Sequence, residues 1–120
     1  MHELSIAQNI LEIVRESVPA DELADVRIIR LKLGTFSGVV ADSLDFCFSA
    51  ISVETPLANA HLEFEHIPFA VLCRHCQKTF ENDLGVVVCP ECGGVDTVIL
   101  SGRELQVTQV ELENEKDKTP

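Results

Sequence analysis

Residues 73–76 read Cys-Arg-His-Cys and residues 89–92 read Cys-Pro-Glu-Cys, with residues 77–88 between the two pairs. Each Cys-x-x-Cys pair fits a tight turn that directs two thiolates toward one point, and two such turns supply four sulfurs in a tetrahedron. This geometry and the softness of the ligands suit a structural Zn²⁺ ion. Gly93 and Gly94 offer the positive-φ freedom that the second turn needs. The spacing predicts a closed zinc site made of Cys73, Cys76, Cys89 and Cys92.

The segment around the cysteines depends on a metal for its folding. Residues 68–102 contain only Phe69 and Phe80 as aromatic residues, too few for a core of their own. Structural zinc contributes about 10–16 kcal/mol to the folding of small zinc fingers. A bound metal would therefore be enough to fold a segment of this size.

Other uses of paired cysteines fit the sequence less well. Disulfides are possible, but a cytosolic chain with this pairing more often binds metal. A redox Cys-x-x-Cys normally lies near a βαβ unit, and we find no such pattern. Iron stays open because four cysteines alone do not distinguish it from zinc. The scarcity of aromatic residues that could shield a redox centre favours zinc.

Length and composition set the outer limits of the fold. The chain has 120 residues, of which 46% are hydrophobic, so it can form one ordinary domain and a small metal-stabilised one. No apolar run reaches the ~20 residues that span a bilayer. Glu3, Glu12 and Glu16 interrupt the amino terminus, which lacks the basic start of a secretory signal. We expect a cytoplasmic, reducing location, in which the four metal thiolates and a free Cys47 are stable.

The charge balance argues against nucleic acid as the partner. Lys and Arg number 9 against 20 Asp and Glu, which gives a net charge of −11. Between residues 68 and 102 the basic residues are Arg74 and Lys78, and the acidic residues are Glu81, Asp83, Glu91 and Asp96. A ribbon that grips DNA or RNA needs a basic face to displace counterions. This segment would repel a phosphate backbone.

The residues before the cysteines predict two helices and a strand. Apolar residues at three- and four-residue intervals predict a helix over about residues 4–18, ended by Pro19. Alternation predicts a strand over residues 26–33. Asp42 or Ser43 is expected to cap a second helix. The buried stripes of the two helices would comprise Leu4, Ala7, Leu11, Val14 and Val18 in the first, and Leu44, Cys47, Phe48 and Ile51 in the second.

Further strands are predicted on both sides of the zinc segment and inside it. Residues 61–65 alternate between polar and apolar, and so do residues 105–112, with a change of phase between Val107 and Val110 that suggests a bulge. Short apolar runs predict small strands at residues 69–72, 86–88 and 98–100. We therefore expect an α+β domain of residues 1–67 and 103–113, an inserted zinc ribbon of residues 68–102, and a flexible acidic tail of residues 114–120.

The first three residues, Met1-His2-Glu3, carry chelating groups of their own. The large side chain of His2 disfavours removal of Met1. The Met1 amine, the His2 amide nitrogen and the His2 imidazole would then lie in consecutive small chelate rings, and the Glu3 amide nitrogen could fill a fourth corner. Four nitrogens in a plane suit Ni(II) or Cu(II). The alternative is an ordinary solvated histidine.

Four motifs together resemble the hydrogenase nickel-incorporation accessory proteins, the HypA family. They are Met-His-Glu-Leu-Ser at residues 1–5, the strand end at residues 31–34, Ser43-Leu44-x-Phe46-x-Phe48, and both cysteine pairs. The resemblance extends to about Leu112. It implies that His2 is the key nickel ligand, that Met1 and Glu3 contribute the amine, amide nitrogen or carboxylate, and that the four cysteines hold structural zinc. It also implies an α+β fold with a small three-stranded antiparallel sheet, two helices and an inserted zinc ribbon.

The resemblance implies a carrier of nickel rather than an enzyme. Its expected metals are structural Zn(II) and Ni(II) as transferred cargo. Its expected partners are an accessory GTPase and the large subunit of [NiFe]-hydrogenase, and some members of the family also serve urease. Two alternatives remain: an acidic zinc-ribbon adaptor without a nickel function, and a zinc-ribbon protein that binds nucleic acid. Retention of Ni(II) by the untagged protein would exclude the first, and salt-dependent affinity for DNA would support the second.

Overall fold

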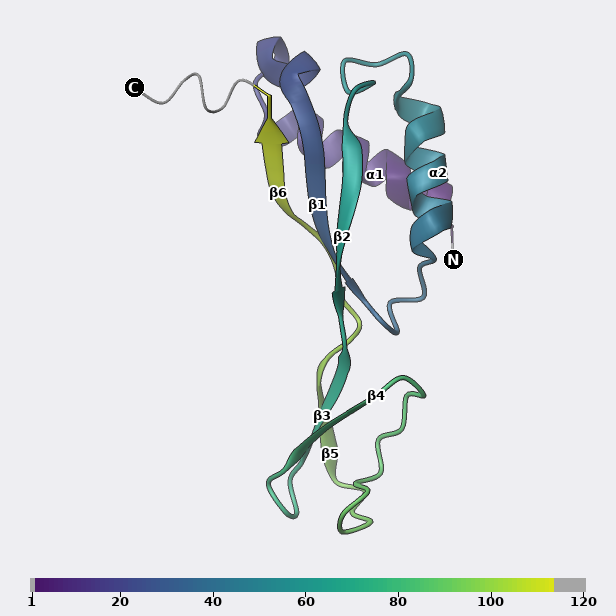
Figure 1. The fold of residues 1–120 in the computed structure, drawn as a ribbon, viewed down its shortest axis with the longest axis vertical. Helices are drawn as coiled ribbons and strands as arrows, with labels where there is room; N and C mark the ends of the chain where they lie inside the picture. Colours follow the sequence, from purple (N-terminus) through teal and green to yellow (C-terminus); the bar gives the residue numbers. More distant parts are fainter. Residues whose placement is uncertain (1, 114–120) are drawn as a thin grey trace, which may run out of the picture. The chain divides into compact units, whose positions relative to one another are not determined.

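The computed structural model describes residues 2–113, which form nine elements (Figure 1). Contacts divide them into two compact units. The helical unit comprises the described residues of Met1–Leu31, Val39–Glu65 and Val107–Pro120, and the ribbon unit comprises Lys32–Gly38 and His66–Gln106. The expected acidic tail, residues 114–120, lies outside the described residues.

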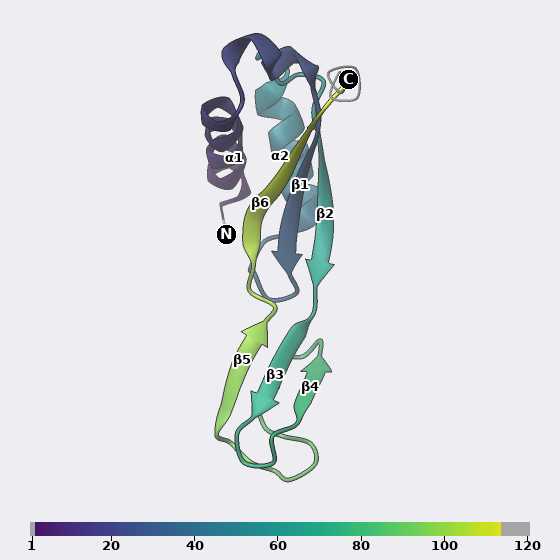
Figure 2. The same ribbon diagram turned by 90° about the vertical axis from the view of Figure 1, so that its left-hand side faces the viewer.

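The helical unit packs two helices on one side of a three-stranded sheet (Figure 2). Its elements are α1 (Glu3–Ser17), the short 3₁₀ helix η1 (Ala20–Asp25), α2 (Ala41–Ser52) and the larger parts of the strands β1 (Val26–Gly34), β2 (His61–Ile67) and β6 (Leu105–Leu112), which form a sheet in the order β2-β1-β6. The arrows of β1 and β2 point downward in Figure 2, and that of β6 points upward in Figure 1. The sheet is therefore mixed rather than wholly antiparallel. Helix α2 provides the crossover connection that the parallel neighbours β1 and β2 require.

The core of the helical unit follows the predicted periodicities closely. Ala7, Ile10 and Val14 of α1 are buried, as are Ile29 and Leu31 of β1. The predicted stripe of α1 was wrong at its start, because Leu4 lies in the first turn and is 49% exposed. In α2, Leu44 and Phe48 are buried as predicted, whereas Cys47 is only half-buried. Over the part of the chain that the structure describes, no helix combines the length and apolar character of a membrane span.

The predicted cap of the second helix is wrong. Helix α2 begins at Ala41 with Val40 as its N-cap residue, and no side chain of Asp42 or Ser43 caps it. The Val40 N–H instead donates a hydrogen bond to Glu3 Oε2 over 3.3 Å. A carboxylate from the first turn of α1 thus stabilises the start of α2.

The ribbon unit is built around β3 (Phe69–Cys73), the central strand of a second sheet. Strands β4 (Thr79–Asn82) and β5 (Thr97–Ser101) pair antiparallel with it on either side, in the order β4-β3-β5. The strand predicted at residues 86–88 is wrong, since this apolar run is an exposed loop. Asn82 explains the difference, because its Oδ1 accepts the N–H groups of Leu84 and Val86 and closes a side-chain turn.

The loop after β1 belongs to the ribbon unit and packs tightly against it. The Phe36 ring lies edge-on to Phe69, with 4.9 Å between the ring centroids. The Phe36 N–H donates to Gly102 O, and Gly34 approaches so closely that a Cβ on it would lie 2.2 Å from Gly102 O. Only a glycine leaves room for this contact. The expected insertion limits at residues 68 and 102 remain a prediction, and residues 32–38 contact the ribbon as well.

Candidate metal centre

The first cysteine pair lies in a tight turn that links β3 to β4. Cys73 ends β3, its N–H donates to Lys78 O over 2.9 Å, and its carbonyl accepts the Gln77 N–H over 2.8 Å. Gln77 has φ 63, the only positive φ of a non-glycine residue in residues 2–113. The sequence gives no sign of this turn position, because glutamine carries no signal for a left-handed backbone.

The second cysteine pair repeats this turn with glycines. The Gly93 N–H donates to Cys89 O over 2.8 Å, and the Cys89 N–H donates to Gly94 O over 3.0 Å. Gly93 has φ 72, as the sequence predicted. Gly94 has no positive φ, and its role is steric, because a Cβ there would lie 3.1 Å from Cys92 Sγ. The two turns therefore contain the same two backbone hydrogen bonds at equivalent positions.

The two turns bring all four sulfurs together. Cys73 Sγ lies 3.6 Å from Cys92 Sγ, and Cys76 Sγ lies 3.6 Å from Cys89 Sγ. All four sulfurs lie within 4.8 Å of one another, and they form the only such group of metal-ligating side chains in the described residues. Four sulfurs at ~2.3 Å from a tetrahedral zinc would be about 3.8 Å apart. The spacing therefore fits a closed tetrahedral metal site.

The electrostatics of the cluster also call for a cation. The Cys92 and Glu91 backbone N–H groups lower the pKa of the Cys89 thiol to about 7. The Gly94 N–H favours the Cys92 thiolate, but desolvation and the neighbouring sulfurs of Cys73 and Cys89 outweigh it and raise the pKa of Cys92 to about 12. Four thiolates cannot coexist here without a metal, whose binding must release protons.

At the amino terminus the structure describes two of the three predicted nickel ligands. His2 is exposed and is the N-cap residue of α1, and its carbonyl accepts the first helical hydrogen bond, from the Ile6 N–H. Glu3 is the first helical residue, and the hydrogen bond from the Val40 N–H lowers the pKa of its carboxyl group. Met1 lies outside the described residues. His2 and Glu3 thus stand at the start of α1.

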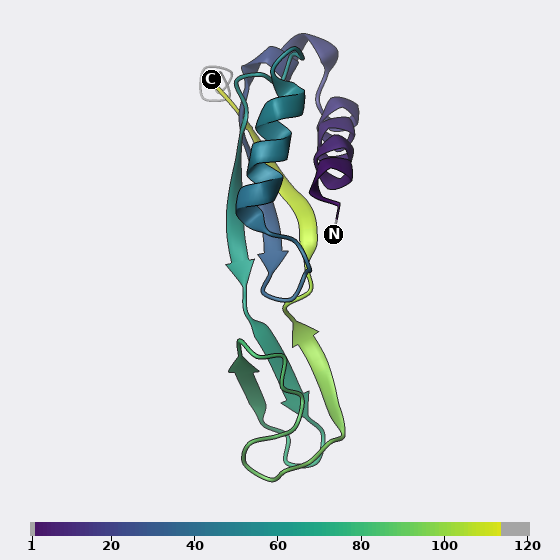
Figure 3. The ribbon, with the colours of Figure 1, turned by 90° about the vertical axis from the view of Figure 1, so that its right-hand side faces the viewer.

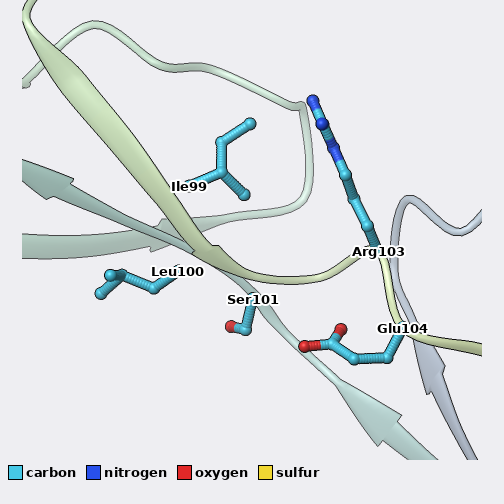
Figure 4. Close-up of a pocket in the computed structure, with 5 residues that line it drawn as sticks. All are labelled: Ile99, Leu100, Ser101, Arg103 and Glu104. Atoms are coloured by element: carbon cyan, nitrogen blue, oxygen red, sulfur yellow. The ribbon is translucent and has the colours of Figure 1, made fainter.

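Neither of the two described hollows resembles a metal site. One, of about 290 Å³, is lined by Ile99, Leu100, Ser101, Arg103 and Glu104 (Figure 4). Its polar groups serve the turn itself: the Ser101 hydroxyl donates to Pro68 O, and Glu104 accepts the Gly102 N–H. Arg103 points away from Glu104. The other hollow contains a cross-strand cluster in which Arg30 pairs with Glu63.

Comparison with known proteins identifies close relatives over the full length of the chain. The family described as "Hydrogenase/urease nickel incorporation, metallochaperone, hypA" matches residues 1–112. The "Hydrogenase maturation factor HypA" of Roseiflexus sp. (strain RS-1) is 40% identical over 121 residues, covering 100% of this chain and 96% of the relative. The protein of the same description from Dehalococcoides mccartyi (strain CBDB1) is 34% identical over 119 residues, covering 99% of this chain and 100% of the relative.

Two solved structures share the fold. The solution structure of the Ni metallochaperone HypA from Helicobacter pylori superposes with a TM-score of 0.64 at 20% identity, covering 93% of this chain and 97% of that one. A second solution structure of a HypA protein gives 0.67 at 20% identity, with 93% and 96% covered. These structural similarities show a shared fold, whereas the family match and the sequence relatives show which family the chain belongs to. The chain belongs to the HypA family of nickel metallochaperones for hydrogenase maturation, whose members are maturation factors rather than enzymes.

Proposed function

We propose that this chain carries Ni(II) at its amino terminus and delivers it for the maturation of [NiFe]-hydrogenase. The ligands would be the Met1 amine, the amide nitrogen and imidazole of His2, and the Glu3 amide nitrogen. The observation that carries the proposal is the exposed His2 directly before the first turn of α1, in a member of a nickel-incorporation family. Delivery to urease is a second use that the family description supports.

The start of α1 supports the proposed chelate. The first N–H groups of a helix have no acceptor within the helix, and the first helical bond is donated by Ile6. The amide nitrogens of His2 and Glu3 are therefore not needed for the hydrogen bonds of α1. Deprotonated amides that bind nickel would also place negative charge at the positive end of the helix dipole, where it is favourable.

Glu3 offers nickel two possible ligands, its amide nitrogen and its carboxylate, and the carboxylate is the less favourable one. It accepts the Val40 N–H, and the lowered pKa of the group reflects that bond. Binding nickel through this carboxylate would break the contact between the starts of α1 and α2. We therefore assign the amide nitrogen of Glu3 to nickel and the side chain to the fold.

The four cysteines would hold a structural Zn(II) ion. Two matched turns and four close sulfurs suit a metal that stabilises the ribbon and does no chemistry. The ribbon would then present a rigid surface to partners, which we propose are the accessory GTPase of nickel insertion and the hydrogenase large subunit. Hydrogenase maturation by these partners would take place in the cytoplasm.

The alternative functions have less support. Residues 68–102 contain two basic side chains of Lys or Arg, and both lie near carboxylates: Lys78 Nζ lies 2.5 Å from Glu91 Oε2, and Arg74 Nε lies 4.0 Å from Asp96 Oδ1. This pairing disfavours the binding of a nucleic-acid backbone along these residues. A zinc-ribbon adaptor without nickel would leave the Met-His-Glu start, with its exposed His2, without a use.

Calorimetric titration with Ni(II) tests the proposal on the untagged, zinc-loaded protein. We expect one tight site, which His2→Ala and His2→Gln both abolish while the zinc content stays at one ion per chain. Neither substitution touches the core, so circular dichroism should stay unchanged. Equal nickel affinity of His2→Ala and the natural sequence would contradict the proposal.

A further inference from the structure

The outward face of α2 presents a line of apolar side chains to solvent. Phe46, Ala50 and Val53 recur at i, i+4 and i+7, so they share one face over about two helical turns, roughly 10 Å. Val53 belongs to this line because it keeps helical backbone angles as the C-cap residue. Phe46 is 75% exposed and Val53 67% exposed, whereas Leu44 on the inner face of the same helix is 0% exposed. A projecting phenylalanine in an aliphatic line indicates a contact surface.

The charged side chains of α2 and its ends that flank this apolar line are all negative. At 100° per residue, Asp42 and Asp45 flank it on one side and Glu54 flanks it on the other, and all three are exposed. Residues 39–60 contain no Lys, Arg or His. The complementary partner surface therefore has an apolar centre with basic residues on both sides.

The helix that carries this face begins next to the amino terminus. Val40, the N-cap residue of α2, donates its N–H to Glu3 Oε2 over 3.3 Å. Figure 3 shows α1 and α2 side by side, with their first turns at the same end of the helical unit. A protein that docks on α2 is thereby held beside His2.

We propose that this surface docks a basic amphipathic helix of the protein that receives nickel. The docking face consists of Asp42, Asp45, Phe46, Ala50, Val53 and Glu54. Apolar side chains of the incoming helix pack on Phe46 and its neighbours, and lysines or arginines on both sides pair with the three carboxylates. The carboxylates accelerate the encounter, and so small an apolar line releases its partner quickly. The inference rests on the proposed nickel-carrier function and adds the place where the recipient binds.

The surface is tested first with a defined probe. The ¹⁵N-labelled, zinc-loaded full chain is titrated with a synthetic helical peptide that carries a leucine face between two rows of lysines. We expect chemical-shift changes confined to residues 40–54 and their neighbours, and at least about tenfold weaker binding after Phe46→Ser. Leu84→Ser is the matched control, because it removes an apolar side chain that is 83% exposed in the ribbon unit. The control should bind as the natural sequence does.

Two results of the titration would overturn the surface. One is equal affinity of Phe46→Ser and the natural sequence. The other is shifts spread over acidic residues outside the face, such as Glu12 and Glu16, which would mean attraction by net charge alone. A peptide with glutamates in place of the lysines should not bind, and its binding would contradict the assigned charge complementarity.

The role of the surface is tested by hydrogenase activity in the protein's own host after deletion of the chromosomal copy. We expect the natural sequence and Leu84→Ser to restore activity, and Phe46→Ser to restore at least about tenfold less with unchanged nickel affinity and zinc content. If Phe46→Ser restores hydrogenase activity as fully as the natural sequence does, the docking surface is wrong, but the proposed nickel-carrier function is not contradicted. Failure of the natural sequence itself would contradict the proposed function.

Discussion

At the scale of single residues, Glu3 does more than the sequence suggested. Its carboxylate holds the N–H of Val40, a contact between residues 37 positions apart. No local pattern predicts such a contact, because it depends on how α1 and α2 pack. Gln77 is a second example, since it takes a left-handed backbone in a position that glycine occupies in the matching turn. The four cysteines, by contrast, could be assigned from spacing alone, because each turn is local.

Replacing Glu3 by alanine should destabilise the helical unit slightly without loss of tight nickel binding. The pKa of the Glu3 carboxyl group is lowered below its usual 4.5, so the stabilisation is fully present above that pH and is lost as the pH falls through the lower value. Thermal unfolding of Glu3→Ala and the natural sequence should therefore differ at pH 7 and converge in acid. A gap of equal size at both pH values would exclude the carboxylate as its cause, and loss of tight nickel binding would assign that carboxylate to nickel.

At the scale of elements, the strands and helices that alternate regularly were predicted well. Strand β1 and helix α1 have strong periodic patterns and begin or end within one residue of the prediction. The predictions fail where a single hydrogen-bonding side chain or a chain connection, rather than local periodicity, decides the structure. Asn82 turns the apolar run of residues 86–88 into a loop, and the crossover through α2 makes β2 parallel to β1. Neither effect leaves a signature in hydrophobic periodicity.

Gly34→Ala tests the close contact between the loop after β1 and the ribbon. A Cβ at this position would lie 2.2 Å from Gly102 C and O, so backbone must move, at a cost of about 2–3 kcal/mol. Gly93→Ala is the control: it places a Cβ on a backbone whose φ is already 72, makes no contact within 4 Å, and should cost about 1 kcal/mol. Denaturant unfolding of the zinc-loaded proteins measures both. No loss of stability in Gly34→Ala would mean that the close contact has no energetic weight.

At the scale of the whole molecule, two units with different sources of stability share one chain. The helical unit has a core of aliphatic and aromatic side chains, and the ribbon unit has few buried residues apart from Phe69, Val71 and two cysteines. Composition and cysteine spacing predicted a second unit that depends on a metal for its folding, and that dependence stays a prediction. They could not predict that residues 32–38 contact the ribbon, because that contact depends on the fit of Phe36 against Phe69.

Cys89→Ala should separate the two units in their stability. The substitution removes one of four sulfurs, so zinc content should fall far below one ion per chain and the ribbon should lose its fold. The helical signal in circular dichroism should persist, because α1 and α2 pack on a core without metal. Zinc analysis of the purified variant decides the assignment: full occupancy would contradict the four-cysteine site.

The central claim is that nickel is held through a free amino terminus, and adding one residue before Met1 tests it most directly. The extension converts the Met1 amine into an ordinary amide and removes the close-packed chelate rings, although His2 and all four cysteines remain. Calorimetric Ni(II) titration, with zinc analysis on the same samples, compares the extended and the natural chain. We predict that the extended protein loses tight nickel binding, as His2→Ala does, and keeps one zinc per chain and its native fold. If the extended protein binds nickel as tightly as the natural one, the amino-terminal site is wrong.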